Sequence, residues 1–278
     1  MQLVFKGKKS GKVHRIKRKS LIGQVVIVLL GLEVLFLSSF TAFELPTANG
    51  SNLHLFVRQR LEMVVSQLPA RWQAKIYRAA PEIAEPASKA VRYSLYVPQA
   101  PAAIFLGYVL SYPLATIAAA LFVVAGLVAP VFNVHLFVAG GGVDYYLQPG
   151  FGYLLGLVAA SSLVGLITKN RRTTISQLLS TAVGLVVVHL TGLAYLLGIC
   201  LFFSIFQDLH TSPVWSQWVF EQARNLTWYA LPYDFLFGLV GVALGSPFRW
   251  LVNILVAPDI AVKHHQPEQL RMTGPMGG

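Results

Sequence analysis

Polar side chains suited to binding a small ligand gather at one end of the apolar segments in this sequence. The densest group is the stretch AGGGVDYYLQPGFGYLLG at residues 139–156, which lies between two long apolar runs. Tyrosines, amides and one or two carboxylates around glycines suit a neutral, planar, hydrogen-bonding ligand in a mostly apolar pocket. We predict a ligand-binding site formed by Glu33, Gln99, Gly141, Gly142, Asp144, Tyr146, Gln148, Tyr153, His189, Tyr233 and Asp234.

Each ionisable residue of this group could have a structural role instead of a role in ligand binding. Asp234 has apolar sequence on both sides, and this isolation favours a functional role. Glu33 lies near the middle of the first apolar run, so it is either a site residue or a buried hydrogen-bonding partner. His189 lies inside another apolar run, where a histidine more often satisfies a neighbouring helix. Asp144 alternatively ends a turn beside the glycines, and tyrosines at a membrane boundary are often interfacial anchors.

The sequence contains no motif for catalysis or nucleotide binding. A glycine-rich phosphate loop ending in Lys-Ser/Thr is absent, so the chain cannot itself drive transport by ATP hydrolysis. No nucleophile and base, and no acid pair, is evident. No histidine pair at metal-binding spacing lies in an apolar run, and His264-His265 lies in a polar tail. We therefore expect no catalytic residue, no metal site and no cofactor, and we do not expect an enzyme.

The composition is that of an integral membrane protein. Hydrophobic residues make up 55% of the 278 positions and charged residues only 12%, about half of the roughly 25% typical of soluble domains. The net charge is +11, but the basic residues collect at the ends of apolar runs rather than along one face. That placement fits orientation in a lipid bilayer and argues against a nucleic acid as partner.

Six apolar runs, one of them extended by its flanks, can cross a bilayer. They cover residues 21–43, 101–110, 114–129, 152–168, 175–206 and 226–244. We predict an all-α integral membrane protein, a six-transmembrane-helix bundle with an added amphipathic helical insertion. The predicted parts are a basic cytoplasmic arm at 1–20, a first transmembrane helix at 21–43, a polar insertion with amphipathic helices at 44–96, a five-helix remainder with the ligand pocket at 97–257, and a cytoplasmic tail at 258–278.

Positive charge indicates how the spans are oriented. Lysines and arginines at 1–19 and 169–172 mark cytoplasmic segments, so both termini are expected in the cytoplasm and the protein in the cell inner (plasma) membrane. The central loop, which joins the third and fourth spans at residues 130–151, and residues 207–225 then lie outside. The insertion at 44–96 is also outside in this topology, and its basic residues strain the rule. Its amphipathic helices either lie flat on the membrane surface or dock on the helices below.

Several short motifs occur in a characteristic order. They are YVPQAP at 96–101, PVF at 130–132, GGG at 140–142 and QPGFGYLLG at 148–156. Together they resemble the BioY family, the biotin-binding S components of energy-coupling factor (ECF) transporters. The last motif is similar to the family signature Gly-Pro-Thr-Gly-Gly-Tyr-Leu-x-Gly-Phe. The likeness covers about residues 93–245, and the HLTG motif at 189–192 looks most like the cyanobacterial branch.

The resemblance implies a six-helix S component whose outward-facing pocket captures biotin, working with a transmembrane T component and cytoplasmic ATPase subunits. By motif, Tyr153 matches the signature tyrosine and Asp234 the aspartate of the family's Gly-Asp-x-x-Lys element, whose lysine is Phe237 here. The family meets its T component through an Ala-x-x-x-Ala face on the first helix, which residues 21–43 lack. Ala115 and Ala119 on the third span would allow close helix contact.

If the ligand is biotin, Asp234 can accept hydrogen bonds from the ureido N–H groups. For the ligand carboxylate we favour the backbone N–H groups of residues 140–142, which can form an anion-binding nest. The alternatives are the cations Lys89, Arg92 and Arg224. Two other functions stay open. One is an S component for another small vitamin, and the other is a membrane interaction or scaffold protein whose pocket is vestigial.

Overall fold

The structure is a computed structural model of the chain that describes residues 20–83, 90–137, 140–170, 173–206 and 217–256. Several expectations therefore fall outside the described residues. They concern the basic arm at 1–19, Lys89, the basic pair at 171–172, most of the connection at 207–225, and the tail at 258–278.

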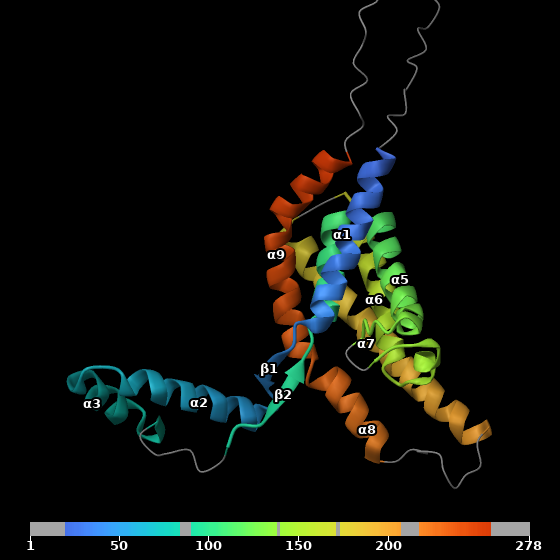
Figure 1. Cartoon of the computed structure of the whole chain (residues 1–278). Helices are drawn as coiled ribbons and strands as arrows, with labels where there is room; N and C mark the ends of the chain where they lie inside the picture. The colour runs from blue at the N-terminus through green and yellow to red at the C-terminus, as the bar shows by residue number, and fades with distance from the viewer. Residues whose placement is uncertain (1–19, 84–89, 138–139, 171–172, 207–216, 257–278) are drawn as a thin grey trace, which may run out of the picture.

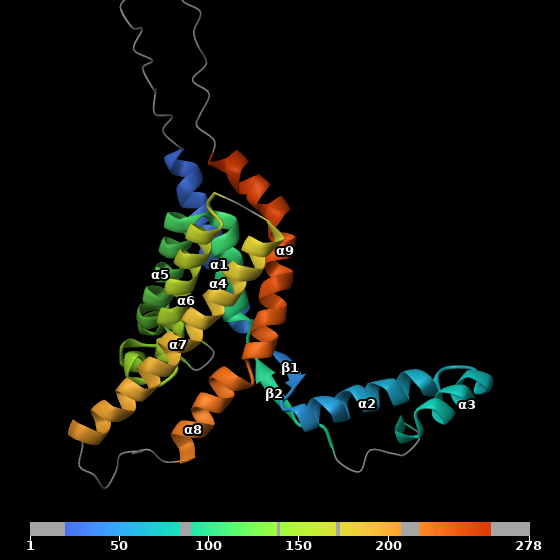
Figure 2. The ribbon, with the colours of Figure 1, turned by 180° about the vertical axis from the view of Figure 1, so that it is seen from behind.

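A bundle of apolar helices forms the body of the molecule (Figure 1). Its helices are α1 (Leu21–Phe40), α4 (Gln99–Leu110), α5 (Tyr112–Val128), α6 (Phe151–Ile167), α7 (Thr174–Phe206) and α9 (Leu231–Leu255). Four helical segments are long and apolar enough to cross a membrane, and α4 and α6 are shorter apolar helices. The start of α1 and the end of α9 lie at the same end of the bundle (Figures 1 and 2). The chain is a multi-pass membrane protein.

The centre of the bundle is α4. Nine of its 12 residues are buried, and it packs against α1, α5, α6, α7 and α9. A helix that is apolar all round belongs in a protein core or a membrane, and here neighbouring helices cover most of α4. Because Gln99 begins α4, the first turn of this central helix lies at the end of the bundle where the polar residues gather.

Close contact between α6 and α7 depends on glycines. A Cβ on Gly156 would lie 2.8 Å from the backbone Cα and O of Val188, and a Cβ on Gly192 would lie 2.4 Å from the ring of Tyr153. Small residues let membrane helices approach until their backbones nearly touch. This approach places Tyr153 of α6 beside His189 of α7, with ring centroids 6.1 Å apart.

A two-stranded antiparallel sheet, which the sequence did not indicate, covers one end of the bundle. Strand β1 (Phe43–Pro46) pairs with β2 (Tyr93–Tyr96), and Phe43 lies opposite Tyr96. The Tyr233 hydroxyl donates to the carbonyl of Pro46, which ties the sheet to α9. The first span is therefore shorter than the predicted 21–43, because the chain leaves the helix after Phe40 to form β1.

Between the two strands the chain forms an arm that extends away from the bundle. It consists of α2 (Gly50–Ser66), α3 (Ala70–Ala79) and the short 3-10 helix η1 (Pro81–Ile83). These helices pack on one another and on β1. Figures 1 and 2 show the arm running crosswise to the bundle axis, at the end that carries the sheet. This arrangement does not match the alternative in which the insertion docks on the apolar helices.

Four short helices lie at the same end as the sheet. They are η2 (Ala129–Phe132), η3 (Val143–Leu147), α8 (Gln217–Ala223) and the π-helix η4 (Arg224–Trp228).

The predicted bounds 226–244 of the last span are wrong, because α9 begins at Leu231 and continues through Pro247 to Leu255. A proline within a membrane helix is tolerated when neighbouring groups satisfy the freed backbone. Figures 1 and 2 show α9 changing direction toward its C-terminal end.

We expect Gly156→Ala to destabilise the bundle by about 1–3 kcal/mol, because the added methyl group overpacks the α6–α7 contact. The matched control is Gly198→Ala on α7, where a Cβ would meet nothing within 4 Å. That substitution should leave stability unchanged or raise it by up to about 1 kcal/mol, since alanine favours helix more than glycine does. Thermal unfolding in detergent measures both, and equal midpoints for the two variants would contradict the packing.

Candidate ligand-binding site

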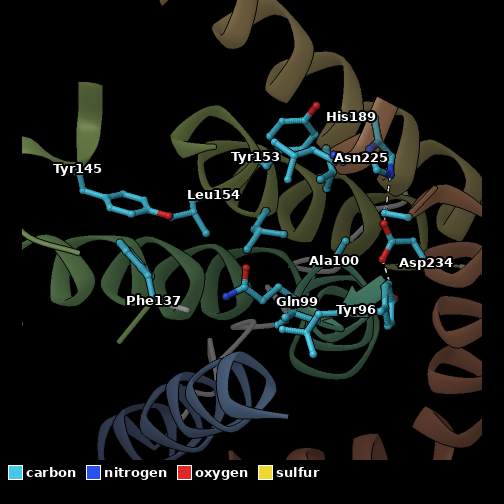
Figure 3. Close-up of a pocket in the computed structure, with 16 residues that line it drawn as sticks. Tyr96, Gln99, Ala100, Phe137, Tyr145, Tyr153, Leu154, His189, Asn225 and Asp234 are labelled. Atoms are coloured by element: carbon cyan, nitrogen blue, oxygen red, sulfur yellow. Dashed lines mark hydrogen bonds and ion pairs between the residues drawn. The ribbon is translucent and has the colours of Figure 1, made fainter. Parts of the chain in front are cut away.

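A cavity of about 330 Å³ opens between the sheet and the ends of the bundle helices (Figure 3). This volume is at the lower end of the ~300–1,000 Å³ typical of small-molecule sites. Its apolar walls come mainly from Leu95, Val97, Ala100, Phe137, Leu154, Leu157, Val188, Leu226 and Ala230. Its polar lining residues are Tyr96, Gln99, Tyr145, Tyr153, His189, Asn225 and Asp234.

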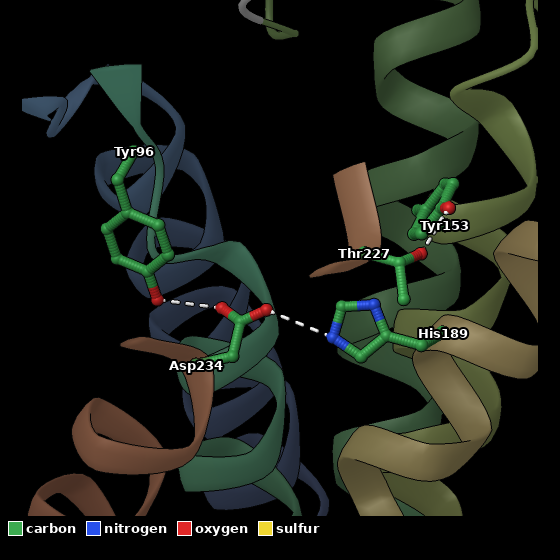
Figure 4. A network of polar contacts seen from close by, with 5 residues as sticks. All are labelled: Tyr96, Tyr153, His189, Thr227 and Asp234. Atoms are coloured by element: carbon green, nitrogen blue, oxygen red, sulfur yellow. Dashed lines mark hydrogen bonds and ion pairs between the residues drawn. The ribbon is translucent and has the colours of Figure 1, made fainter. Parts of the chain in front are cut away.

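A buried carboxylate with two partners lies at one side of this cavity (Figure 4). The Tyr96 hydroxyl donates to Asp234 Oδ1 over 2.7 Å, and His189 Nε2 lies 3.2 Å from Asp234 Oδ2. The residues come from β2, α9 and α7, and each is no more than 5% exposed. Burying an ionised carboxylate is costly unless it is hydrogen-bonded and paired. The contacts of Asp234 therefore depend on three elements meeting at one point.

His189 retains unused hydrogen-bonding capacity. Its Nδ1 atom is buried and has no hydrogen-bond partner among the described residues. The contact of Nε2 with Asp234 has the distance of an ion pair but not the alignment of a hydrogen bond. An unsatisfied buried polar atom costs roughly 1–3 kcal/mol. Because His189 lines the cavity, a bound ligand can supply the missing partner.

Two further polar side chains are held in place from neighbouring elements. The hydroxyl groups of Tyr153 and Thr227 lie 2.7 Å apart, which joins α6 to the π-helix η4. Gln99 Nε2 donates to Ser39 Oγ over 2.9 Å, which joins the start of α4 to the end of α1. These contacts fix the tyrosine ring and the amide before any ligand binds, which lowers the entropic cost of binding.

The cavity carries one acidic side chain, that of Asp234, and no basic lysine or arginine. Burial, and then the charge of Asp234, raises the pKa of the Tyr96 phenol. Burial also raises the pKa of Tyr145. Both phenols thus stay neutral and can donate hydrogen bonds. Among the described residues no group of three side chains could hold a metal ion.

The structure brings four of the predicted site residues to this cavity and places the others elsewhere. Asp234, Tyr153, Gln99 and His189 line it. Tyr233 lines a neighbouring cavity on the other side of the sheet residues. The six residues outside both cavities are Glu33, Gly141, Gly142, Asp144, Tyr146 and Gln148.

The central loop turns a different residue inward than we expected. In η3 the side chain of Tyr145 is buried and reaches the cavity, whereas Asp144 and Tyr146 on either side of it are exposed. Gln148 is exposed as well. Adjacent residues of a helical turn point in different directions, so only one of three consecutive side chains can face the site.

Two of the three glycine N–H groups of this loop are bonded to backbone carbonyls of the same chain. Gly140, Gly141 and Gly142 all have positive φ, between 105° and 112°. The Gly142 N–H donates to the carbonyl of Gly126 on α5, and the Gly140 N–H donates to the carbonyl of Phe137. These two donors are therefore used within the fold, and the predicted anion-binding nest is not supported.

Glu33 lies on the outer side of its helix. The buried face of α1 contains Ile27, Gly31 and Leu35, at a spacing of four residues. Glu33 is two residues before Leu35, about 200° around the helix, and it is exposed. Its side chain therefore points away from the bundle interior, as the positions of the buried residues on the same helix require.

Several cavity residues were absent from the predicted site. Tyr96 lies three positions before Gln99 and just outside α4, so its nearness to that glutamine was a usable signal. Tyr145 was one of three tyrosines in the central loop without a distinguishing feature. Asn225 lines the cavity and depends on the π-helix η4, which has no sequence signature that we used. The next residue but one, Thr227, lies outside the lining and contacts it through the Tyr153 hydroxyl.

The fold and the cavity define a multi-pass membrane protein with a small, mostly apolar binding pocket at one end of its helices. The BioY family model matches residues 91–249, more than half of the chain. The chain belongs to the BioY family. This membership also confirms the expectation that the chain is not an enzyme.

Two known proteins are similar to parts of this chain. A protein of Lysinibacillus sphaericus described as a probable biotin transporter BioY is 30% identical over 63 residues, which are 22% of this chain and 32% of that protein. The match thus spans about a third of that relative. A crystal structure of the S component for biotin from an ECF-type ABC transporter aligns with 73% of this chain and 93% of that chain, at 16% identity and a TM-score of 0.36.

We expect Tyr96→Phe to destabilise the protein by roughly 1–3 kcal/mol, because it removes a hydrogen bond to a buried carboxylate. The matched control is Tyr93→Phe on the same strand, whose side chain is 50% exposed and should tolerate the change. In an Asp234→Asn background the effect of Tyr96→Phe should shrink, since the two groups interact directly. Thermal unfolding in detergent of the wild type, the two single variants and the double variant measures this coupling. If the destabilisations caused by Tyr96→Phe and Asp234→Asn simply add, the contact between the two side chains contributes nothing.

Proposed function

We propose that this protein is a substrate-capture component of a biotin uptake transporter. Biotin enters the cavity from the outer face of the membrane and is delivered inward with the help of ATPase partners. The observation that carries the proposal is the buried Asp234, held between Tyr96 and His189 at the wall of the cavity. Membership of the BioY family supports the same ligand class.

The chemistry of the cavity suits the bicyclic end of biotin. The ureido ring has two N–H donors and a carbonyl acceptor, and the fused thiophane ring is apolar. Each oxygen of a carboxylate can accept more than one hydrogen bond, so Asp234 can accept from ureido N–H groups while keeping its present partners. The neutral phenol of Tyr145 and the amide of Asn225 are donors for the ureido carbonyl. Leu154, Leu157 and other apolar lining residues can pack against the thiophane ring.

The relationship to one branch of the family belongs to the same proposal. His189 lies in the HLTG motif at 189–192 that resembles cyanobacterial members, and in the structure His189 contacts Asp234. We propose that the chain is of this cyanobacterial type. An S component for another small vitamin is the alternative, and competition of labelled biotin with a panel of vitamins separates the two.

The partners that we propose are a T component and ATPase subunits, because no nucleotide-binding loop occurs in the sequence. The place where they dock needs correction. Ala115 and Ala119, which we expected to allow close helix contact, are both 0% exposed within the bundle. They therefore pack against helices of this chain and cannot contact a partner.

We further propose that both termini lie in the cytoplasm and that the cavity faces outward. Lys169 follows α6 at the end of the bundle opposite the cavity, near Arg249 of α9. Positive residues are concentrated in cytoplasmic segments of membrane proteins. In this orientation the loops predicted to lie outside the membrane stay outside, and the arm and the sheet lie outside with them.

Replacing Asp234 with Asn tests the ligand contact. The substitution keeps the shape but removes the charge, and charge-assisted hydrogen bonds contribute roughly 1.5–3 kcal/mol each, so biotin affinity should fall about 10- to 100-fold. The control is Asp144→Asn, the same substitution at an exposed loop position outside the cavity. Isothermal titration calorimetry on purified protein measures both. Unchanged affinity of the Asp234 variant would remove this residue from the site.

Cysteine labelling tests the proposed orientation. The native Cys200 is buried, so background labelling should be low. With a membrane-impermeant maleimide on intact cells, Val143→Cys on η3 should react, because it is exposed at the cavity end. Lys169→Cys at the opposite end should react only after permeabilisation. The reverse pattern would place the cavity in the cytoplasm and contradict the orientation.

A further inference from the structure

A second cavity adjoins the first and is lined in part by residues of strand β2. It has a volume of about 490 Å³, and it shares five lining residues with the first cavity. The shared residues are Leu95, Tyr96, Asn225, Leu226 and Ala230. The two cavities are therefore direct neighbours, with these five residues between them.

The two cavities differ in charge. Arg92 and Arg224 line the second cavity together with the amides of Asn49, Asn52 and Asn225. Neither an aspartate nor a glutamate is among its lining residues. The first cavity has the opposite character, with the carboxylate of Asp234 and no cation. The pair of cavities thus offers an acceptor for N–H groups at one end and two cations at the other.

Arg92 is held in place by the arm. Asn52 of α2 accepts from the Arg92 backbone N–H and donates Nδ2 to the Arg92 carbonyl, both over 2.8 Å. The same Nδ2 donates to the Thr47 carbonyl over 3.0 Å, and the Thr47 N–H donates to the Arg92 carbonyl over 2.9 Å. Asn52 is only 8% exposed. These bonds fix the backbone from which the arginine side chain reaches the cavity.

Arg224 lines the same cavity from a different element. It is the first residue of the π-helix η4, and its guanidinium lies over the ring of Tyr229, 5.6 Å from the centroid. The next residue, Asn225, lines both cavities. Because Arg224 and Asn225 are consecutive, a ligand that contacts Asn225 in the first cavity lies near the guanidinium-bearing residue of the second.

We infer that the second cavity binds the anionic end of the ligand, with Arg92 and Arg224 as the residues that recognise its carboxylate. The ring end then lies in the first cavity, so the site selects molecules that combine a hydrogen-bonding ring with a tail ending in a carboxylate. This inference rests on the proposed function. It replaces the glycine nest at 140–142, whose residues line neither cavity.

The inference also gives the arm a role in recognition. Thr47, Asn49 and Asn52 line the second cavity or hold its arginine, and they lie before the region that matches the family. The arm and the sheet thus complete one half of a site whose other half belongs to the family fold. Arginine is suited to this role, because its planar group can bind a carboxylate through two parallel hydrogen bonds.

The test compares biotin with its uncharged methyl ester on purified full-length protein. Wild type should bind the acid at least about tenfold more tightly than the ester, since each charge-assisted contact is worth about that factor or more. Arg92→Gln and Arg224→Gln should each weaken binding of the acid by about tenfold and leave binding of the ester unchanged. The control is Arg60→Gln on the arm, whose guanidinium lies over Phe56 and which lines neither cavity.

Ester binding also reports whether each variant is folded. If wild type binds acid and ester equally, or if the double arginine variant keeps the preference for the acid, the inference is overturned while biotin capture stands. If wild type binds neither molecule, the proposed function fails and the anion subsite fails with it. Loss of ester binding in the arginine variants would assign both residues to the fold of the site rather than to the carboxylate, and would also overturn the inference.

Discussion

A carboxylate held within an apolar membrane bundle is the constraint on which this structure depends. Asp234 is 4% exposed, and its two oxygens meet Tyr96 from the sheet and His189 from α7. Removing either partner leaves a buried charge poorly compensated, which is strongly unfavourable. The sheet, α7 and α9 must therefore keep their relative positions, and the cavity beside them is preorganised by the same contacts.

That arrangement depends in turn on how closely the helices approach one another. Gly156 meets the backbone of Val188, one residue before His189, so the glycine sets the distance of the histidine from α6. The Tyr233 hydroxyl on Pro46 and the ring of Phe237 stacked on Tyr96 fix the sheet against α9. Phe237 occupies the position where related sequences were expected to have a lysine. The cations near the sheet are Arg92 and Arg224, which line the second cavity.

The predictable part of the fold was the set of apolar runs, because length and composition mark membrane helices strongly. The isolation of Asp234 in apolar sequence and the motif that contains Tyr153 led us to predict both as site residues, and both line the same cavity. The central loop was harder, since the direction of Tyr145 and its neighbours is set by the turn of η3. The strand pairing of Phe43 with Tyr96 joins segments more than 50 positions apart, and no local pattern indicated it. That pairing decides where Tyr96 and Arg92 lie, so the sequence alone could not give their contacts.

The central claim is that Asp234 binds the ring of a biotin-like ligand inside the first cavity. A structure of the purified protein with biotin bound, determined by cryo-electron microscopy or crystallography, tests it most directly. The account predicts that a ureido nitrogen lies about 3 Å from an oxygen of Asp234, with the ring against Leu154 and Leu157. A ligand bound elsewhere, or an Asp234 side chain that faces lipid away from Tyr153, would contradict it.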